Sequence, residues 1–126
     1  MAAAPMHLAP FTSFKGTSDP EEWLDFRFRL KWYLDVTHPQ LVATMTGIED
    51  NLALQVPDFD TFTPMEQQHG RTLLAALGTY CVDAAGSFVK NFVEFESPSH
   101  GYLLWQRMNI RFSFFIAPSN DDLGAA

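Results

Sequence analysis

The chain has 126 residues, which suffices for one domain that buries about two thirds of its unfolded surface. Its apolar content of 47%, with 12 phenylalanines, excludes a disordered chain and predicts a packed core. The net charge of −7 argues against direct binding of this segment to nucleic acid or to an anionic membrane, and no uncharged run is long enough to span a bilayer.

The first predicted element is a helix from about residue 20 to 36, which follows a flexible arm over residues 1–13. Asp19 can cap this helix, and Pro20 suits its first position because no hydrogen-bonded N–H is lost there. The Glu22 carboxylate is placed to bond the backbone N–H of the cap residue. The apolar residues that follow at helical spacing predict one buried stripe, widened by two more aromatic residues: Trp23, Phe26, Leu30 and Tyr33 or Leu34, with Phe28 and Trp32.

A half-buried strand is the competing interpretation of this stretch. Apolar and basic residues alternate from Phe26 to Trp32, which is the period of a strand. The doublets Trp23-Leu24 and Tyr33-Leu34 break that alternation, and together with the capped start they favour the helix.

A second, shorter helix is predicted from Pro39 to about Asn51, because the residue before a proline is pushed away from helical geometry and ends the first helix. Residues 52–63 are expected to form a loop held by the Phe59 and Phe62 rings. Several apolar residues should face the core from this second helix, namely Leu41, Val42, Met45 and Ile48.

A third start signal, a capping box from Thr63 to Glu66 with proline at the first helical position, predicts a long helix from 64 to about 94. Leu77 lies on its apolar stripe, and Gly86 is the point at which the helix could split. A last helix is predicted from His100 to Phe112, and three of its residues share the buried face: Trp105, Met108 and Phe112. The fold class expected is therefore all-α, a compact bundle of four to five helices.

The three consecutive apolar residues Phe114, Phe115 and Ile116 are the candidate interface. They stand just before Pro118, and residues 118–126 resemble the start of a further helix. A group of this kind, if exposed, marks an interaction site.

No catalytic, cofactor or metal site is expected, so the chain is not predicted to be an enzyme. The four histidines are never three or four residues apart, and the carboxylate pairs all fall at helix ends or in loops. Arg107 and Arg111 are expected to lie on a solvated helix face. Cys81, the single cysteine, should be a buried structural thiol, and the absence of any possible internal disulfide fits a reducing, cytoplasmic location.

Two motifs carry a family resemblance. The segment FKGTSDPEEWLDF, residues 14–26, resembles the opening of the Gag capsid region of LTR retrotransposons and of their domesticated relatives. The segment GYLLWQRMNIRF, residues 101–112, is similar to the motif that closes the N-terminal half of such capsids, with Leu104 in place of the usual small residue and Met108 in place of the usual leucine. Residues 39–62 match nothing in the family's pattern.

This resemblance implies a capsid N-terminal-domain-like bundle over residues 14–117 and a truncated second half, or a tail, over residues 118–126. It implies a structural protein that self-associates into a shell, with RNA bound only through regions outside this segment. Two alternatives stay open: a monomeric helical adaptor that binds a partner peptide or helix, and an unrelated helical domain with the same core aromatics.

Overall fold

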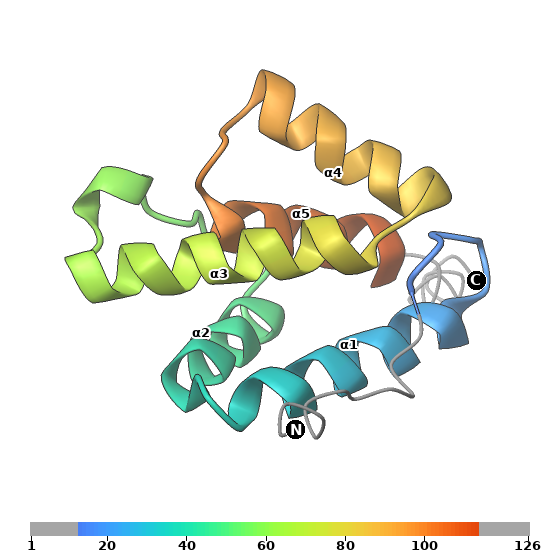
Figure 1. Ribbon diagram of the computed structural model, residues 1–126, viewed down its shortest axis with the longest axis horizontal. Coiled ribbons are helices and arrows are strands. Elements are labelled where there is room, and N and C mark those ends of the chain that lie inside the picture. Colours follow the sequence, from blue (N-terminus) through green and yellow to red (C-terminus); the bar gives the residue numbers. More distant parts are fainter. Residues whose placement is uncertain (1–12, 114–126) are drawn as a thin grey trace, which may run out of the picture.

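The computed structural model describes residues 13–113, and within that range the chain is an all-α bundle of five helices without a strand, as the sequence predicts (Figure 1). A short 3-10 turn, η2 (Phe59–Thr61), lies in the connection between the second and third helices. The helices are α1 (Pro20–Asp35), α2 (Pro39–Asp50), α3 (Pro64–Tyr80), α4 (Asp83–Phe95) and α5 (Gly101–Ser113).

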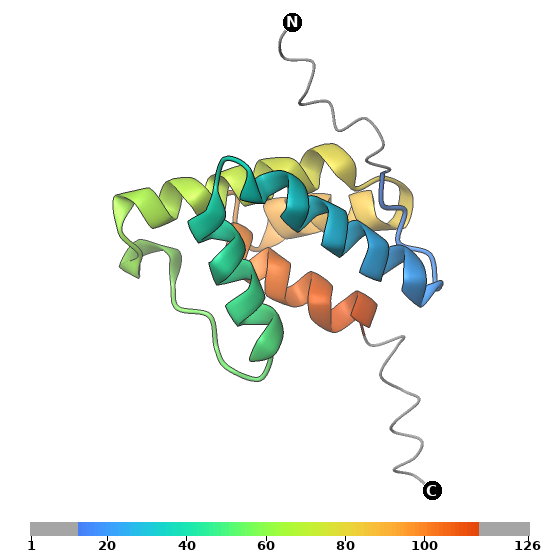
Figure 2. The ribbon, with the colours of Figure 1, turned by 90° about the horizontal axis from the view of Figure 1, so that it is seen from below.

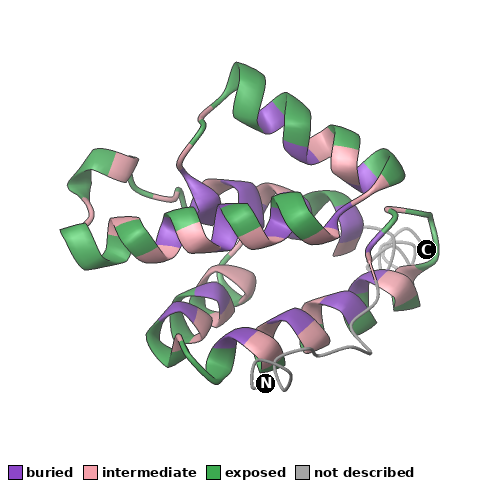
Figure 3. Ribbon diagram, in the orientation of Figure 1, coloured by how far each residue is buried: buried purple, intermediate pink, exposed green. Residues whose placement is uncertain are grey.

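Helix α5 lies at the centre and packs against α1, α2 and α3, as two perpendicular views show (Figures 1 and 2). Helix α4 packs on α3 and reaches the C-terminal end of α5 through an edge-to-face contact of Phe88 with Phe112, whose ring centroids are 5.8 Å apart. The buried residues of α1, α2, α3 and α5 face this interior, whereas much of α4 is exposed (Figure 3).

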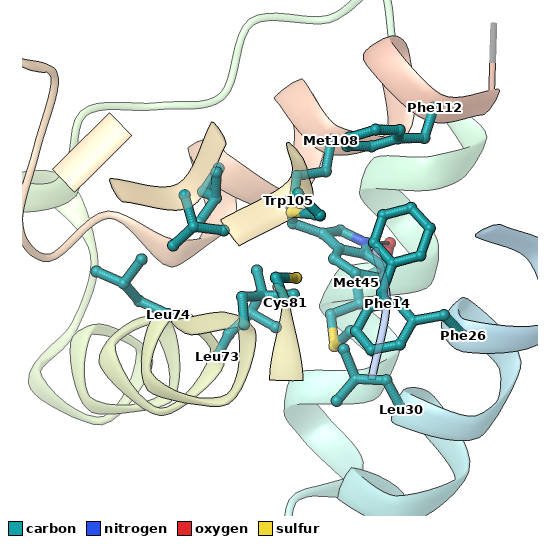
Figure 4. Close-up of a cluster of buried hydrophobic side chains, with 14 of the residues drawn as sticks. Phe14, Phe26, Leu30, Met45, Leu73, Leu74, Cys81, Trp105, Met108 and Phe112 are labelled. Atoms are coloured by element: carbon teal, nitrogen blue, oxygen red, sulfur yellow. Dashed lines mark hydrogen bonds between the residues drawn. The ribbon is translucent and has the colours of Figure 1, made fainter. Parts of the chain in front are cut away.

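The core is built around aromatic rings from opposite ends of the sequence. Trp23 and Trp105 are 1% and 0% exposed, and their ring centroids lie 5.6 Å apart. Phe14 is fully buried between α1 and α5, stacked on Phe26 and edge-on to Phe112 (Figure 4). All of the residues expected to anchor the core are buried: Trp23, Phe26, Leu30, Leu77, Trp105, Met108 and Phe112.

Both buried indoles satisfy their N–H groups, which a buried tryptophan requires. Trp23 Nε1 donates to Ser113 Oγ at 2.9 Å, and Trp105 Nε1 donates to the carbonyl of Met45 at 3.2 Å. The two bonds tie α5 to α1 at one end and to α2 in the middle, so α5 is fixed between them.

The start of α1 is partly as predicted. Asp19 caps the helix through a bond from Glu21 N to its Oδ1 at 3.0 Å, and Pro20 occupies the first position. Glu22 does not bond the cap residue. Its carboxylate accepts hydrogen bonds from the backbone N–H groups of Lys15 at 2.8 Å and of Thr17 at 3.0 Å. The residues before α1 fold back over its first turn. Their backbone N–H groups bond the Glu22 carboxylate, which was expected to complete the cap at Asp19.

The prediction of one long helix from 64 to about 94 is wrong, because the helix is interrupted at residues 81–82. Phe14 N donates to the Tyr80 carbonyl, and Val82 N donates to the Phe14 carbonyl, both at 2.9 Å. The N-terminal segment thus takes backbone groups that a continuous helix would use, and α4 restarts at Asp83 with φ 53°. Gly86, the expected splitting point, lies inside α4.

The last helix packs against α3 at two glycines. A Cβ at Gly101 would overlap the Gly70 carbonyl oxygen and stand 2.9 Å from Leu74 N, so only glycine fits there. His100 is buried just before α5. Its ring bonds the Pro57 carbonyl at 2.8 Å, which fastens the α2–α3 connection to the start of α5.

Candidate interaction surfaces

The outer face of α1 carries an exposed apolar stripe, here called the α1 stripe. Its members are Leu24, Phe28, Trp32 and Val36, which are 41%, 61%, 64% and 70% exposed. They recur every fourth residue, a spacing that brings side chains onto one face of a helix. The Phe28 and Trp32 rings contact each other, with centroids 5.6 Å apart.

The α1 stripe lies opposite the buried face of the same helix. Phe28 is two residues from the buried Leu30, so it points about 200° away around the helix axis. The sequence interpretation that Phe28 and Trp32 widen the buried stripe is therefore wrong. A helix that is apolar on both faces is typical of one covered on both sides, and the described part of the chain covers only the inner face of α1.

The charges on α1 divide between the two faces. On the inner edge, Lys31 Nζ bonds Glu49 at 2.8 Å, and Arg27 lies 3.9 Å from the same oxygen and donates to Asn109 at 2.8 Å. On the outer edge, beside the α1 stripe, Arg29 Nε bonds both oxygens of Asp25 at 3.1 Å. The inner charges join α1 to α2 and α5, whereas the outer pair is exposed and open to exchange.

A second surface is a cavity of about 310 Å³, here called the α2–α5 pocket. The end of α2, the connection after it and the first turns of α5 line it. Its lining is mostly apolar: Thr44, Gly47, Ile48, Asn51, Leu54, Gln55, Val56, Pro57, Phe62, Tyr102 and Gln106.

Hydrogen bonds hold the wall of the α2–α5 pocket in place. Gln106 Nε2 donates to the carbonyls of Leu52 at 3.1 Å and Leu54 at 2.7 Å. The Tyr102 hydroxyl donates to the Glu66 carbonyl at 2.7 Å, and burial, with the nearby Glu66 charge, raises the pKa of Tyr102 to about 12. Gln106 therefore fixes the connection between α2 and α3 from α5. The rings expected to hold this loop do so: Phe59 lies 5.5 Å from the His100 ring and Phe62 lies 4.9 Å from the Tyr102 ring, between centroids.

The described residues form no group of three or more side chains that could hold a metal ion. His38 and His69 do come together, with ring centroids 5.6 Å apart, although the sequence separates them widely. Cys81 is buried at the junction of α3 and α4, and burial raises its pKa to about 12, so the reactive thiolate is disfavoured.

The interface expected from the sequence, Phe114, Phe115 and Ile116, lies outside the described residues. Neither the α1 stripe nor the α2–α5 pocket was expected. Leu24, Phe28 and Trp32 recur every fourth residue, and this spacing was a signal for the α1 stripe, because it places them on a different side of the helix from the buried residues. The α2–α5 pocket had no such signal in the sequence, because it depends on how the irregular connection between α2 and α3 packs against α5.

Comparisons of the chain with protein-family models, curated proteins and solved structures return no match. Within residues 13–113, none of the helices combines the length and the apolar character needed to cross a bilayer.

Proposed function

We propose that this chain is a non-enzymatic, cytoplasmic structural protein whose copies associate with one another through the α1 stripe. The observation that carries the proposal is the position of Phe28 and Trp32, two large aromatic side chains on the solvent face of a helix whose other face forms the core. The motifs at residues 14–26 and 101–112, which resemble those of Gag capsids, support shell-type assembly over other forms of self-association.

A second copy fits the charges that border the α1 stripe. Asp25 and Arg29 lie on the same edge, four residues apart. When two copies of α1 pack in antiparallel orientation, Asp25 of one copy can face Arg29 of the other, and the reverse pair forms by symmetry. The same orientation opposes the two helix dipoles favourably. The surface is therefore complementary to itself.

The expected strength of this contact is low. Burying a large apolar side chain completely is worth about 1.5–3 kcal/mol, and the four stripe residues are only partly exposed. Two copies together would gain on the order of 10 kcal/mol, which is similar to the cost of association. One contact then gives a weak dimer, and a stable shell needs further contacts acting together.

Light scattering across a concentration series tests the proposal. The average mass of the native chain should rise with concentration. The double variant Phe28→Glu with Trp32→Glu should stay monomeric with an unchanged helical circular dichroism signal, because both side chains are exposed. Phe95→Glu is the matched control: Phe95 is 77% exposed on α4, and its replacement should leave association intact.

Equal association of the native chain and the double variant would disprove the role of the α1 stripe. A native chain that stays monomeric at every concentration would contradict self-association itself. The function would then be that of a monomeric adaptor.

A further inference from the structure

The part of the sequence that supplies most of the α2–α5 pocket lining is acidic. No lysine or arginine occurs between Lys31 and Arg71, whereas six carboxylates do: Asp35, Glu49, Asp50, Asp58, Asp60 and Glu66. Glu49 is neutralised by the basic residues of α1, but neither Asp50 nor Asp58 forms an ion pair within residues 13–113. Arg71 stands over the Phe59 ring at 5.8 Å and forms no ion pair in that range either.

Asp50 and Asp58 are neighbours in sequence of residues that line the pocket. Asn51 follows Asp50 at the end of α2, and Pro57 precedes Asp58 in the connection. The pocket is therefore an apolar hollow, and the exposed residues Asp50 and Asp58 are each one position from its lining. Negative charge so near the pocket attracts cations and repels phosphates, which disfavours a nucleotide or a nucleic acid as the occupant.

The size and lining of the pocket suit one large apolar side chain. A volume of about 310 Å³ is at the lower end of ligand pockets in proteins. Ile48, Val56 and Phe62 supply apolar walls, and Leu54, 64% exposed, stands at the border where a bound chain could cover it.

The Gln106 side chain in the wall can bond a peptide backbone. Because Gln106 Nε2 donates to two carbonyls, the other end of the amide must be the oxygen. That oxygen accepts no hydrogen bond from the described residues, and it is not one of their fully enclosed polar atoms, so a bound segment can reach it. A backbone N–H of a bound segment would satisfy it, which an apolar small molecule could not do.

We propose that the α2–α5 pocket binds a peptide segment in which one large apolar side chain is flanked by lysine or arginine. The apolar side chain fills the hollow, a backbone N–H donates to Gln106, and the basic residues face Asp50 and Asp58. This binding does not depend on self-association through the α1 stripe, which lies on a different surface.

The pocket can be filled by mutation without disturbing the helix. A Cβ added at Gly47 meets nothing within 4 Å, and Gly47 lines the pocket. Gly47→Leu should therefore occupy the hollow and strengthen α2, because glycine inside a helix is unfavourable. Gly78 on α3 is the matched control, since it is also an exposed helical glycine with open space around its Cβ, and it does not line the pocket.

The test is selection of random displayed peptides on the full chain, followed by fluorescence anisotropy with the enriched peptides. We expect enriched sequences to carry an aromatic or large aliphatic residue next to lysine or arginine. Binding should be abolished by Gly47→Leu and unchanged by Gly78→Leu. Asp50→Asn with Asp58→Asn should weaken it by about threefold to tenfold at low salt, and much less at high salt.

Three results would overturn the proposal: no enrichment, enriched peptides without basic residues, or equal binding by Gly47→Leu and Gly78→Leu. Neither variant should alter the light-scattering result for the α1 stripe, so the two proposals can fail separately.

Discussion

The two faces of α1 carry similar apolar side chains, but one face is buried and the other is exposed. Trp23 on the inner face is buried and bonds Ser113, whereas Trp32 on the outer face is exposed beside Phe28. Each face also has its own ion pairs, closed against α2 on the inside and open to solvent on the outside. Helix α1 therefore has more apolar side chains than the core can bury, and the remaining ones form an exposed apolar surface.

The largest expected effect separates the two tryptophans. Trp23→Ala should lower the free energy of unfolding by about 3–5 kcal/mol, because it leaves a cavity among packed rings. Trp32→Ala should change it by no more than about 0.5 kcal/mol at concentrations where the chain is monomeric. Chemical denaturation of both variants measures the difference, and equal losses would show that the outer face also belongs to the core.

The next effect compares the ion pairs of the two faces. Glu49→Gln should cost about 1–3 kcal/mol, because Arg27 and Lys31 lose a partner whose side chain is only 9% exposed. Asp25→Asn should cost about 0.5 kcal/mol or less, because its pair with Arg29 is exposed. Denaturation at low and high salt distinguishes them, and a larger loss from Asp25→Asn would reverse the assignment of the two faces.

The smallest effect concerns the anchoring of the start of α1 and depends on pH. Burial acts to raise the pKa of Glu22, but hydrogen bonds from Lys15 and Thr17 outweigh it and lower the pKa below the ordinary value of 4.5. The unfolded chain therefore binds this proton more readily, so Glu22 stabilises the fold above about pH 4.5 and loses that contribution as the pH falls through the folded pKa.

Thermal unfolding of the native chain and of Glu22→Gln from about pH 6 to about pH 3 checks this expectation. The native chain should be slightly more stable at the higher pH, and the two curves should converge on acidification. A gap that widens as the pH falls would contradict the assigned hydrogen bonds.

Local signals in the sequence predict most of the fold. Asp19 caps α1, and the capping box of Thr63 with Glu66 forms at the start of α3, because these bonds join residues a few positions apart. The break at residues 81–82 could not be found this way. It depends on Phe14, which reaches the junction from the other end of the sequence.

The two surfaces were harder to predict for a related reason. A spacing of apolar residues shows which side chains share a face of α1, but it does not show that the core has room for only one such face. Likewise, the α2–α5 pocket depends on bonds from Gln106 and His100 to backbone carbonyls of an irregular connection. Those contacts are set by tertiary packing.

The most direct test of the α1 stripe uses the fluorescence of Trp32. Trp32 is the exposed member of three tryptophans, since Trp23 and Trp105 are buried, so quenching by acrylamide that is lost in Trp32→Phe reports on this side chain. If copies associate through the stripe, Trp32 should become protected from acrylamide over the same concentrations at which the mass rises in light scattering. Association with Trp32 still fully open to the quencher would contradict the account.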